Sequence, residues 1–264
     1  MNQTIFIKEK QEWDANLSFY TTEEKSIFKK YLNKKALNFF LIKGGTVIDI
    51  GCATGEFLEI LPKKCKKYGV DFSQTFVGYA AKKRPAIKFV KASADKLPFK
   101  NNYFDGIIFK GTLHHLKAQG ILKESLMEAD RVLKKGGKIY IHDRCRSFAG
   151  KILHDLAINL RKKLKKIKLN QATCASNHEP NFGTRDLSYL INTKKYKVSN
   201  QQYVLNFVFF LMVCFTNTVQ YVVGFQIAEV LRYILYPLVL LSDLFFNQKN
   251  LTIEEFIILQ KPLK

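Results

Sequence analysis

The sequence lacks the cysteine patterns that define disulfide-stabilised and zinc-binding proteins. Its five cysteines are odd in number and widely spaced, and no CxxC pair occurs among them. An even set of closely spaced cysteines is typical of a disulfide framework, and paired CxxC motifs are typical of a structural zinc site. Neither is therefore expected, no metal site is predicted, and the cysteine usage fits a reducing cytoplasm.

Targeting and repeat signals are also missing. The N-terminal stretch MNQTIFIKEKQEWDANLSF carries charges throughout and has no uninterrupted apolar core, so a secretory signal is not predicted. No internal repeat or low-complexity linker divides the chain. With 264 residues, of which 47% are hydrophobic, we expect one main domain with an elaborated end.

Acidic residues are scarce relative to basic ones. Lys and Arg total 43 against 22 Asp and Glu, which gives a formal net charge of +21. Such an excess attracts polyanions, for example nucleic acid or an anionic membrane face. Scattered lysines can equally be a solvated surface, so the charge indicates partners and not a fold. We expect a cytoplasmic protein, with peripheral attachment to a membrane as an open alternative.

Apolar runs, glycine turns and helical patterns alternate through the first half of the chain. A helical pattern covers residues 13–41, with Thr22 as a candidate cap. Strands are expected at 47–50, 68–72, 87–92, 104–109 and 138–143, and helices at 57–61, 73–83 and 122–133. Strands separated by helices predict a parallel sheet with helices on both faces.

Residues that follow the first two strands indicate a nucleoside ligand. Gly51 and Gly55 flank Ala53 in a loop between strand and helix, where small residues allow close approach of a ligand. Asp71 ends the second strand about twenty residues later, where a carboxylate accepts both hydroxyls of a ribose. Glu56 replaces the third glycine of a dinucleotide loop and would repel a pyrophosphate. These features predict an adenosine-type ligand without phosphate, such as S-adenosylmethionine.

Four blocks of sequence resemble the class I S-adenosylmethionine-dependent methyltransferases, the broad group that includes the ubiquinone and menaquinone C-methylases. They are VIDIGCATGEF, VDFS, ASADKLPFKNNYFDGIIF followed by TLHHL, and EADRVLKKGGKIYI, in this order between residues 46 and 143. More weakly, NFGTRDLSYLINTKKYKV resembles the family's helix before the sixth strand, and EEFIILQKP its last strand. The resemblance implies an α/β, Rossmann-like sheet of seven mostly parallel strands with an antiparallel last strand.

The resemblance also implies a set of cofactor-binding residues. It puts Asp49, Gly51, Ala53 and Gly55 around the methionine moiety, Asp71 and Phe72 at the ribose and adenine, and Ser93 with Ala94 at the adenine edge, and Cys52 and Lys110 complete the set. Two positions depart from the family pattern. Ala53 replaces the usual middle glycine, and Ser93 replaces an acidic residue that often binds the adenine amino group, for which Asp95 is an alternative. Because Asp71 is retained, S-adenosylmethionine is expected to bind.

Histidines are the candidate general bases. A sulfonium is already an activated methyl donor, so the protein mainly has to align the acceptor and exclude water. His114 and His115 follow the fourth strand, His142 ends the fifth, and His178 lies in a later loop. Each has a packing or capping role as its alternative, and His115 and His142 are the preferred bases. His142 and the adjacent Asp143 point to opposite faces of a strand, so only one of them can enter a site.

Two segments beyond the five strands are basic or apolar. KILHDLAINLRKKLKKIKL, residues 151–169, combines an apolar stripe with clustered Lys and Arg. This pattern is typical of a helix on an anionic membrane, and a docked amphipathic helix or a nucleic-acid-binding helix are the alternatives. An apolar insertion covers 204–250, and its dense run is shorter than the roughly 20 residues of a spanning helix.

We therefore divide the chain into a helical cover (1–43), a core (44–203 and 251–264) and the insertion (204–250), expected to be a lid or a membrane-associating segment. The favoured function is methyl transfer to a small hydrophobic or membrane-resident acceptor, such as a quinone precursor, prenyl compound or lipid-linked metabolite. A soluble metabolite or glycan is the alternative acceptor. A nucleic-acid role is disfavoured because FKGTL stands where amino-group methylases have an NPPY-like tetrapeptide, and no RNA-binding module occurs. A non-catalytic binding module is the last alternative.

Overall fold

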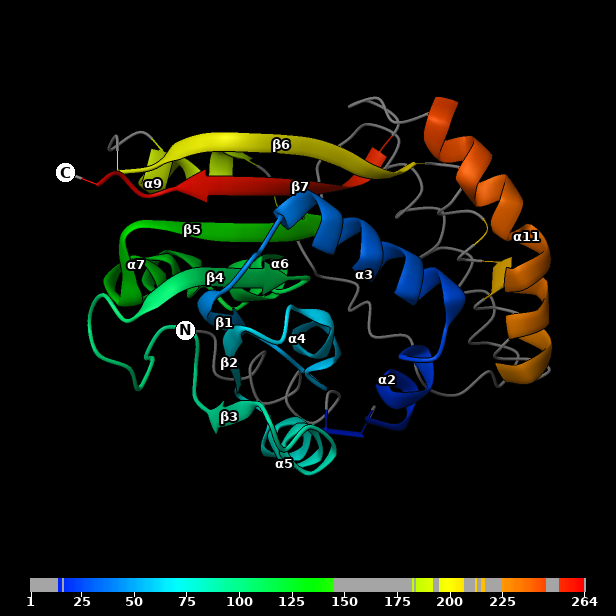
Figure 1. Ribbon diagram of the computed structural model, residues 1–264, viewed down its shortest axis with the longest axis horizontal. Helices are drawn as coiled ribbons and strands as arrows, with labels where there is room; N and C mark the ends of the chain where they lie inside the picture. Colours follow the sequence, from blue (N-terminus) through cyan, green and yellow to red (C-terminus); the bar gives the residue numbers. More distant parts are fainter. Residues whose placement is uncertain are drawn as a thin grey trace.

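A seven-stranded sheet forms the centre of the computed structural model, which describes residues 14–15, 17–144, 182, 184–191, 195–206, 212, 215–216, 225–245 and 252–263 (Figure 1). The strand order is β3-β2-β1-β4-β5-β7-β6. The strands are β1 (Gly45–Ile50), β2 (Cys65–Asp71), β3 (Lys88–Lys91), β4 (Phe104–Lys110), β5 (Leu133–Arg144), β6 (Lys197–Asn206) and β7 (Thr252–Gln260). Only β7 runs antiparallel to its neighbours, β5 and β6, which confirms the predicted fold class.

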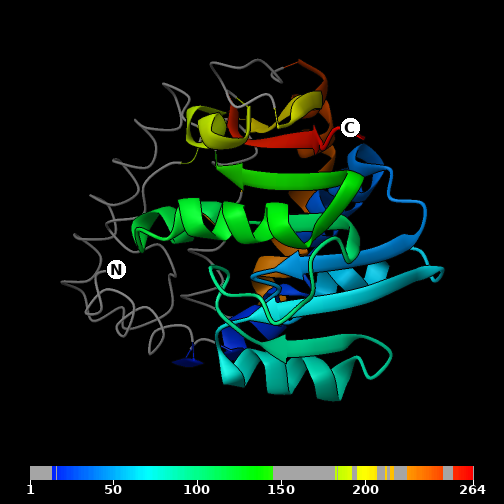
Figure 2. The same ribbon diagram turned by 90° about the vertical axis from the view of Figure 1, so that its left-hand side faces the viewer.

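Helices cover both faces of this sheet (Figure 2). They are α2 (Leu17–Glu23), α3 (Ile27–Phe40), α4 (Glu56–Ile60), α5 (Gln74–Lys83), α6 (Leu113–Ala118), α7 (Leu122–Val132), the 3₁₀ helix η1 (Thr184–Leu187), α9 (Ser188–Ile191) and α11 (Phe225–Phe245). On one face α6, α7 and α9 pack against alternate strand residues such as Ile48 and Ile107. On the other face α3 and α4 pack against Val47 and Ile108. Because successive side chains of a strand point to opposite faces of the sheet, the core consists of two layers.

The N-terminal helical pattern is interrupted, which the sequence does not reveal. The pattern predicts one helix with Thr22 as a cap, but the helix ends at Glu23 and a second begins at Ile27. Thr22 bonds back to the carbonyl of Ser18 at 2.8 Å. The first amide of α3, on Ile27, instead donates to the carboxylate of Glu229 in α11 at 2.7 Å. A partner 202 positions away along the chain therefore replaces the expected local cap.

The C-terminal part agrees with the expected order of elements where it is described. A helical segment precedes β6, and β6 continues to Asn206, inside the range expected for the insertion. Within that range the structure describes α11, which stands at the outer edge of the molecule beside α3 (Figure 1). In the part of the chain that is described, no helix combines the length and apolarity needed to cross a bilayer. The basic stripe at 151–169 and His178 lie outside the described residues.

Candidate functional site

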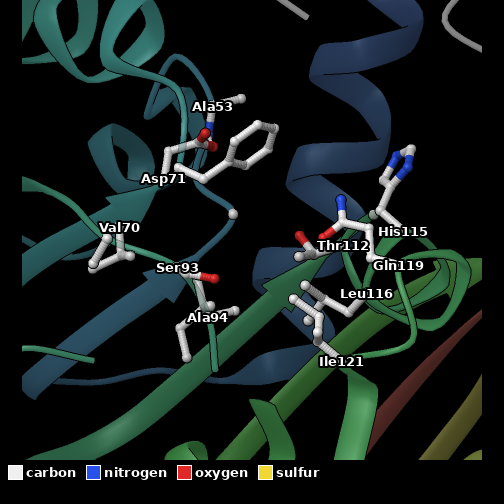
Figure 3. Close-up of a pocket in the computed structure, with 15 residues that line it drawn as sticks. Ala53, Val70, Asp71, Ser93, Ala94, Thr112, His115, Leu116, Gln119 and Ile121 are labelled. Carbon is white, nitrogen blue, oxygen red and sulfur yellow. Dashed lines mark hydrogen bonds between the residues drawn. The ribbon is translucent and has the colours of Figure 1, made fainter. Parts of the chain in front are cut away.

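A cavity opens at the carboxyl ends of the strands where the strand order reverses, between β1 and β4 (Figure 3). The space between its walls, counted together with the part that is open to solvent, is about 600 Å³. Figure 3 shows Ala53, Asp71 and Ser93 on one side, and Thr112 and His115 on the other. The loops after β1, β2 and β3 supply the first side and the segment after β4 supplies the second. Ligands of open α/β sheets bind at such a switch point.

The loop after β1 is a tight turn fixed by its surroundings. Gly51, Ala53 and Gly55 all have positive φ angles, of 76°, 45° and 77°. A Cβ atom on Gly51 would lie 2.5 Å from the side chain of Thr112, so only glycine fits there. Ala53 adopts the left-handed conformation despite its methyl group, which costs about 1 kcal/mol. Ala53, which stands where the usual middle glycine is expected, therefore adopts a conformation that glycine would adopt more readily.

Asp71 holds this loop at the end of β2. One carboxylate oxygen accepts the amide of Ala53 at 2.9 Å, and the other accepts the amide of Ser73 at 2.9 Å. Burial raises the pKa of Asp71 to about 6, while the amides of Ser73, Ala53 and Phe72 act in the opposite direction. The group is therefore ionised at neutral pH and can accept further hydrogen bonds.

The segment after β4 is anchored from β5. Asp143 accepts the amide of Leu113, the first residue of α6, at 2.7 Å, and its second oxygen lies 2.5 Å from Nδ1 of His114. His114 is buried in this contact. His115, the next residue, lines the cavity, and its ring centroid lies 4.0 Å from that of His114. The two adjacent histidines thus have different positions: His114 joins α6 to β5, and His115 faces the cavity.

A cluster of charged side chains lies on the other face of the sheet, under α3 and α4. Lys29 and Asn33 of α3 contact the Glu56 carboxylate at 3.3 Å and 3.1 Å. Burial raises the pKa of Asp49 to about 8, and burial together with the charge of Lys29 lowers the pKa of Lys110 to about 8. Among the described residues, Asp49 Oδ1 has no hydrogen-bond partner. With its pKa raised to about 8, Asp49 is protonated at neutral pH, and a cationic group placed beside it would favour its ionised form.

His142 belongs to this second face and not to the cavity lining. Its Nε2 lies 2.6 Å from the Glu254 carboxylate of β7, and its ring packs edge-on against Phe256 with centroids 4.5 Å apart. Asp143 points to the opposite face, as expected for adjacent strand residues, and pairs with His114. The side chains of His142 and Asp143 therefore lie on opposite faces of the sheet. Of the two preferred bases, His115 and His142, it is His115 that lines the cavity.

The cavity brings together part of the predicted cofactor set. Its lining includes Gly51, Ala53, Asp71, Phe72, Ser93 and Ala94. The other predicted residues, Asp49, Cys52, Gly55 and Lys110, are not among the lining residues. Cys52 lies against β2, since a Cβ on Gly69 would be 2.8 Å from its sulfur. The Ser93 hydroxyl donates a hydrogen bond to the carboxylate of Asp95, the residue that is the alternative to Ser93 at the adenine.

Sequence reasoning missed several lining residues. They are Ile50, Val70, Ala92, Gly111, Thr112, Leu116, Gln119 and Ile121. Ile50, Val70 and Ala92 lie at or just after strand ends, so the rule that selected Asp71 would also have found them. Gln119 and Ile121 follow α6 and carry no local signal, because their position depends on how that helix packs.

A seven-stranded sheet of this order, with a nucleoside-type cavity at its switch point, defines the chain as a Rossmann-like nucleoside-binding protein. Comparisons with known proteins agree. A family described as "Methyltransferase domain" matches residues 48–141. An uncharacterised protein of Methanocaldococcus jannaschii is 33% identical over 153 residues, covering 57% of this chain and 67% of that protein.

Two relatives with named activities are similar over shorter stretches. The 2-phytyl-1,4-naphtoquinone methyltransferase of Nostoc punctiforme is 34% identical over 38% of this chain and 46% of its own length. The tRNA (carboxymethyluridine(34)-5-O)-methyltransferase of Arabidopsis thaliana is 30% identical over 43% of this chain and 28% of its own length. The chain spans about half the length, or less, of the first curated relatives it matches.

Solved structures share the fold over nearly the whole chain. A Haloferax volcanii methyltransferase, determined in complex with a methyltransferase activator, has a TM-score of 0.62 at 16% identity and covers 96% of this chain and 97% of its own. A SAM-dependent methyltransferase of Thermotoga maritima has a TM-score of 0.58 at 19% identity, covering 95% and 99%. The chain belongs to the class I S-adenosylmethionine-dependent methyltransferases. The cofactor of this family is S-adenosylmethionine.

Proposed function

We propose that this chain transfers the methyl group of S-adenosylmethionine to a small hydrophobic acceptor. The observation that carries the proposal is the buried, ionised Asp71 at the switch-point cavity, beside a turn too tight for side chains at Gly51. When bound, the cofactor supplies a methyl group activated by a sulfonium. In the proposal Asp71 accepts the ribose hydroxyls and Phe72 packs on the adenine.

His115 is the proposed proton acceptor for the reacting group. Among the described residues that line the cavity it is the one imidazole, and an imidazole titrates near neutral pH. Leu116 and Ile121 line the same side of the cavity, next to the polar side chains of Thr112 and Gln119. In the proposal these two apolar residues contact a hydrophobic acceptor and help to exclude water from the methyl group.

Two further observations favour a hydrophobic acceptor. A relative at 34% identity is named for its methylation of a naphthoquinone carrying a phytyl chain, which is a lipid-soluble compound. The outer helix α11 exposes large apolar side chains, which is typical of a protein that contacts a lipid surface. We therefore assign a lipid-phase acceptor as the first candidate.

A tRNA acceptor is the second candidate. The net charge of +21 suits a polyanion, and one relative at 30% identity is a tRNA methyltransferase. An RNA substrate would contact an extended basic surface, whereas a lipid-phase acceptor would need the cavity and the apolar edge alone.

The test uses purified protein and methyl-labelled S-adenosylmethionine, offered separately with a lipid extract, unmodified tRNA and a polar metabolite fraction from the source cells. We expect label in the lipid extract. His115→Ala should lower that transfer about 100-fold while cofactor affinity stays unchanged. His142→Ala is the matched control and should retain transfer. Label confined to tRNA or to polar metabolites contradicts the lipid acceptor, and loss in His142→Ala but not in His115→Ala contradicts the choice of base.

Cofactor affinity should also depend on pH through Asp71. Because the pKa of Asp71 is raised to about 6 by burial, the carboxylate becomes protonated below this pH and loses acceptor capacity for the ribose. The dissociation constant of S-adenosylmethionine should therefore rise about tenfold for each pH unit below about 6. Titration calorimetry between pH 5 and 8 measures this slope, and Asp71→Asn should flatten it. An unchanged slope in that variant would assign the titration to another group.

A further inference from the structure

Helix α11 exposes a row of large apolar side chains and buries an arginine. A surface helix normally turns its apolar face to the core and its charged face to water. In α11 the buried positions combine the apolar Ala228 and Val239 with Arg232 and Ser242, which are 1% and 5% exposed. The opposite positions carry large apolar side chains with about half of their surface exposed, among them Val230 at 60% and Ile234 at 65%. The orientation of the helix therefore needs an explanation.

Buried charges fix this orientation. The Arg232 guanidinium contacts the carboxylates of Glu229 at 3.0 Å and Glu23 at 3.3 Å. Glu229 also accepts the amide of Ile27, at the start of α3. Turning α11 about its axis would break these contacts and leave buried charges unpaired, which is strongly unfavourable. The apolar face is thus held outward by the ion pairs beneath it.

The outward face is continuous and carries no charge. The residues Ile227, Val230, Ile234, Leu238 and Leu241 follow one another at steps of three and four, which places them on one side of the helix. Tyr233 and Leu240 flank the stripe and are also exposed. The helix has 21 residues and stands at the outer edge of the molecule (Figure 1). An exposed apolar strip of this length indicates a contact surface.

We propose that this face of α11, named the α11 strip, lies flat on the surface of an anionic lipid bilayer. Charge complementarity decides between a bilayer and a second copy of the chain. Each copy carries a net charge of +21, so two copies repel each other, whereas an anionic surface attracts the chain. Helix α3 packs beside α11, and exposed lysines lie in α3 and just before it, at positions 25, 30 and 34. An apolar face combined with basic neighbours is the pattern of interfacial binding.

The inference rests on the proposed function in one respect, since it puts the enzyme next to an acceptor dissolved in the lipid phase. Vesicle binding does not require methyl transfer, so it can be measured when no acceptor is known. Failure of the α11 strip to bind lipid would leave the cofactor site intact. Failure of methyl transfer would conversely leave vesicle binding unchanged.

The experiment is flotation of the full chain with vesicles of phosphatidylglycerol and phosphatidylcholine, compared with vesicles of phosphatidylcholine alone. The wild type should bind the anionic vesicles, and binding should fall at high salt because screening shortens the range of the attraction. Val230→Glu/Ile234→Glu should reduce binding about tenfold or more, since two apolar contacts become anionic. Leu238→Glu/Leu241→Glu should do the same from the other half of the strip.

The matched control is Ile60→Glu/Met127→Glu, which makes the same change at two exposed apolar residues of α4 and α7. It alters net charge by the same amount but leaves the α11 strip intact, so it should bind vesicles within about twofold of the wild type. All variants should keep the wild-type affinity for S-adenosylmethionine, which reports that they are folded. No binding of the wild type to anionic vesicles would overturn the proposal, as would equal losses in control and strip variants. So would a wild-type dimer that the strip variants convert to monomers.

Discussion

Asp71→Asn is expected to weaken the binding of S-adenosylmethionine about 100-fold. The Asp71 carboxylate already accepts the backbone amides of Ala53 and Ser73, and as an anion it can accept further hydrogen bonds from the cavity. Asparagine has one carbonyl oxygen and no charge, so the two hydrogen bonds from the ribose hydroxyls are weakened together. Two charge-assisted hydrogen bonds contribute about 3 kcal/mol, which corresponds to about two decades in the dissociation constant. Titration calorimetry measures it directly.

Loss of loop structure has to be separated from loss of the ligand contact. Asp105 is the matched control, because its carboxylate likewise accepts a backbone amide, that of Thr46 at 2.8 Å, at the opposite end of β1. Asp105→Asn should lower stability in a thermal melt and leave cofactor affinity unchanged. An affinity for Asp71→Asn within about threefold of the wild type would show that the ribose is bound elsewhere.

The sheet was largely predictable because its signals are local. The buried strands β1, β2, β4 and β5 are apolar runs bounded by turn residues, and parallel pairing follows from the helices between them. Asp71 was found for the same reason, since the carboxyl end of a strand is recognisable from the sequence. On the cavity side that carries Ala53, Asp71 and Ser93, six of the lining residues were predicted, and Ile50, Val70 and Ala92 were missed.

Features that depend on distant contacts were not predictable. Hydropathy identifies α11 as an apolar helix but does not say which side faces the core, because Arg232 finds its partner Glu23 209 positions away. The same holds for His142, whose partner Glu254 lies on β7, 112 positions later. A histidine after a strand looks the same in the sequence whether it faces the cavity, as His115 does, or the other face of the sheet.

Asp143→Ala is expected to lower the free energy of unfolding by about 3 kcal/mol or more. The substitution removes the acceptor of the Leu113 amide and the partner of the buried His114 ring. Loss of a hydrogen-bond acceptor at a helix N-terminus costs about 1 kcal/mol. Removing one member of a buried pair costs more than this, because the other member stays buried without its partner. Because α6 also carries His115, the variant should lose methyl transfer together with stability. Denaturant unfolding followed by circular dichroism measures the change.

Two comparisons make this expectation specific to the buried pair. Asp186 of η1 forms an ion pair at 2.7 Å with Lys117 of α6. Both side chains are partly exposed, so Asp186→Ala should lower the free energy of unfolding by less than about 1 kcal/mol. Combining Asp143→Ala with His114→Phe should cost less than the sum of the single changes, because the phenylalanine needs no partner. Additive losses would show that the Leu113 amide, and not the His114 ring, accounts for the effect of Asp143. The position of His115 in the cavity would then depend on the capping of α6 alone.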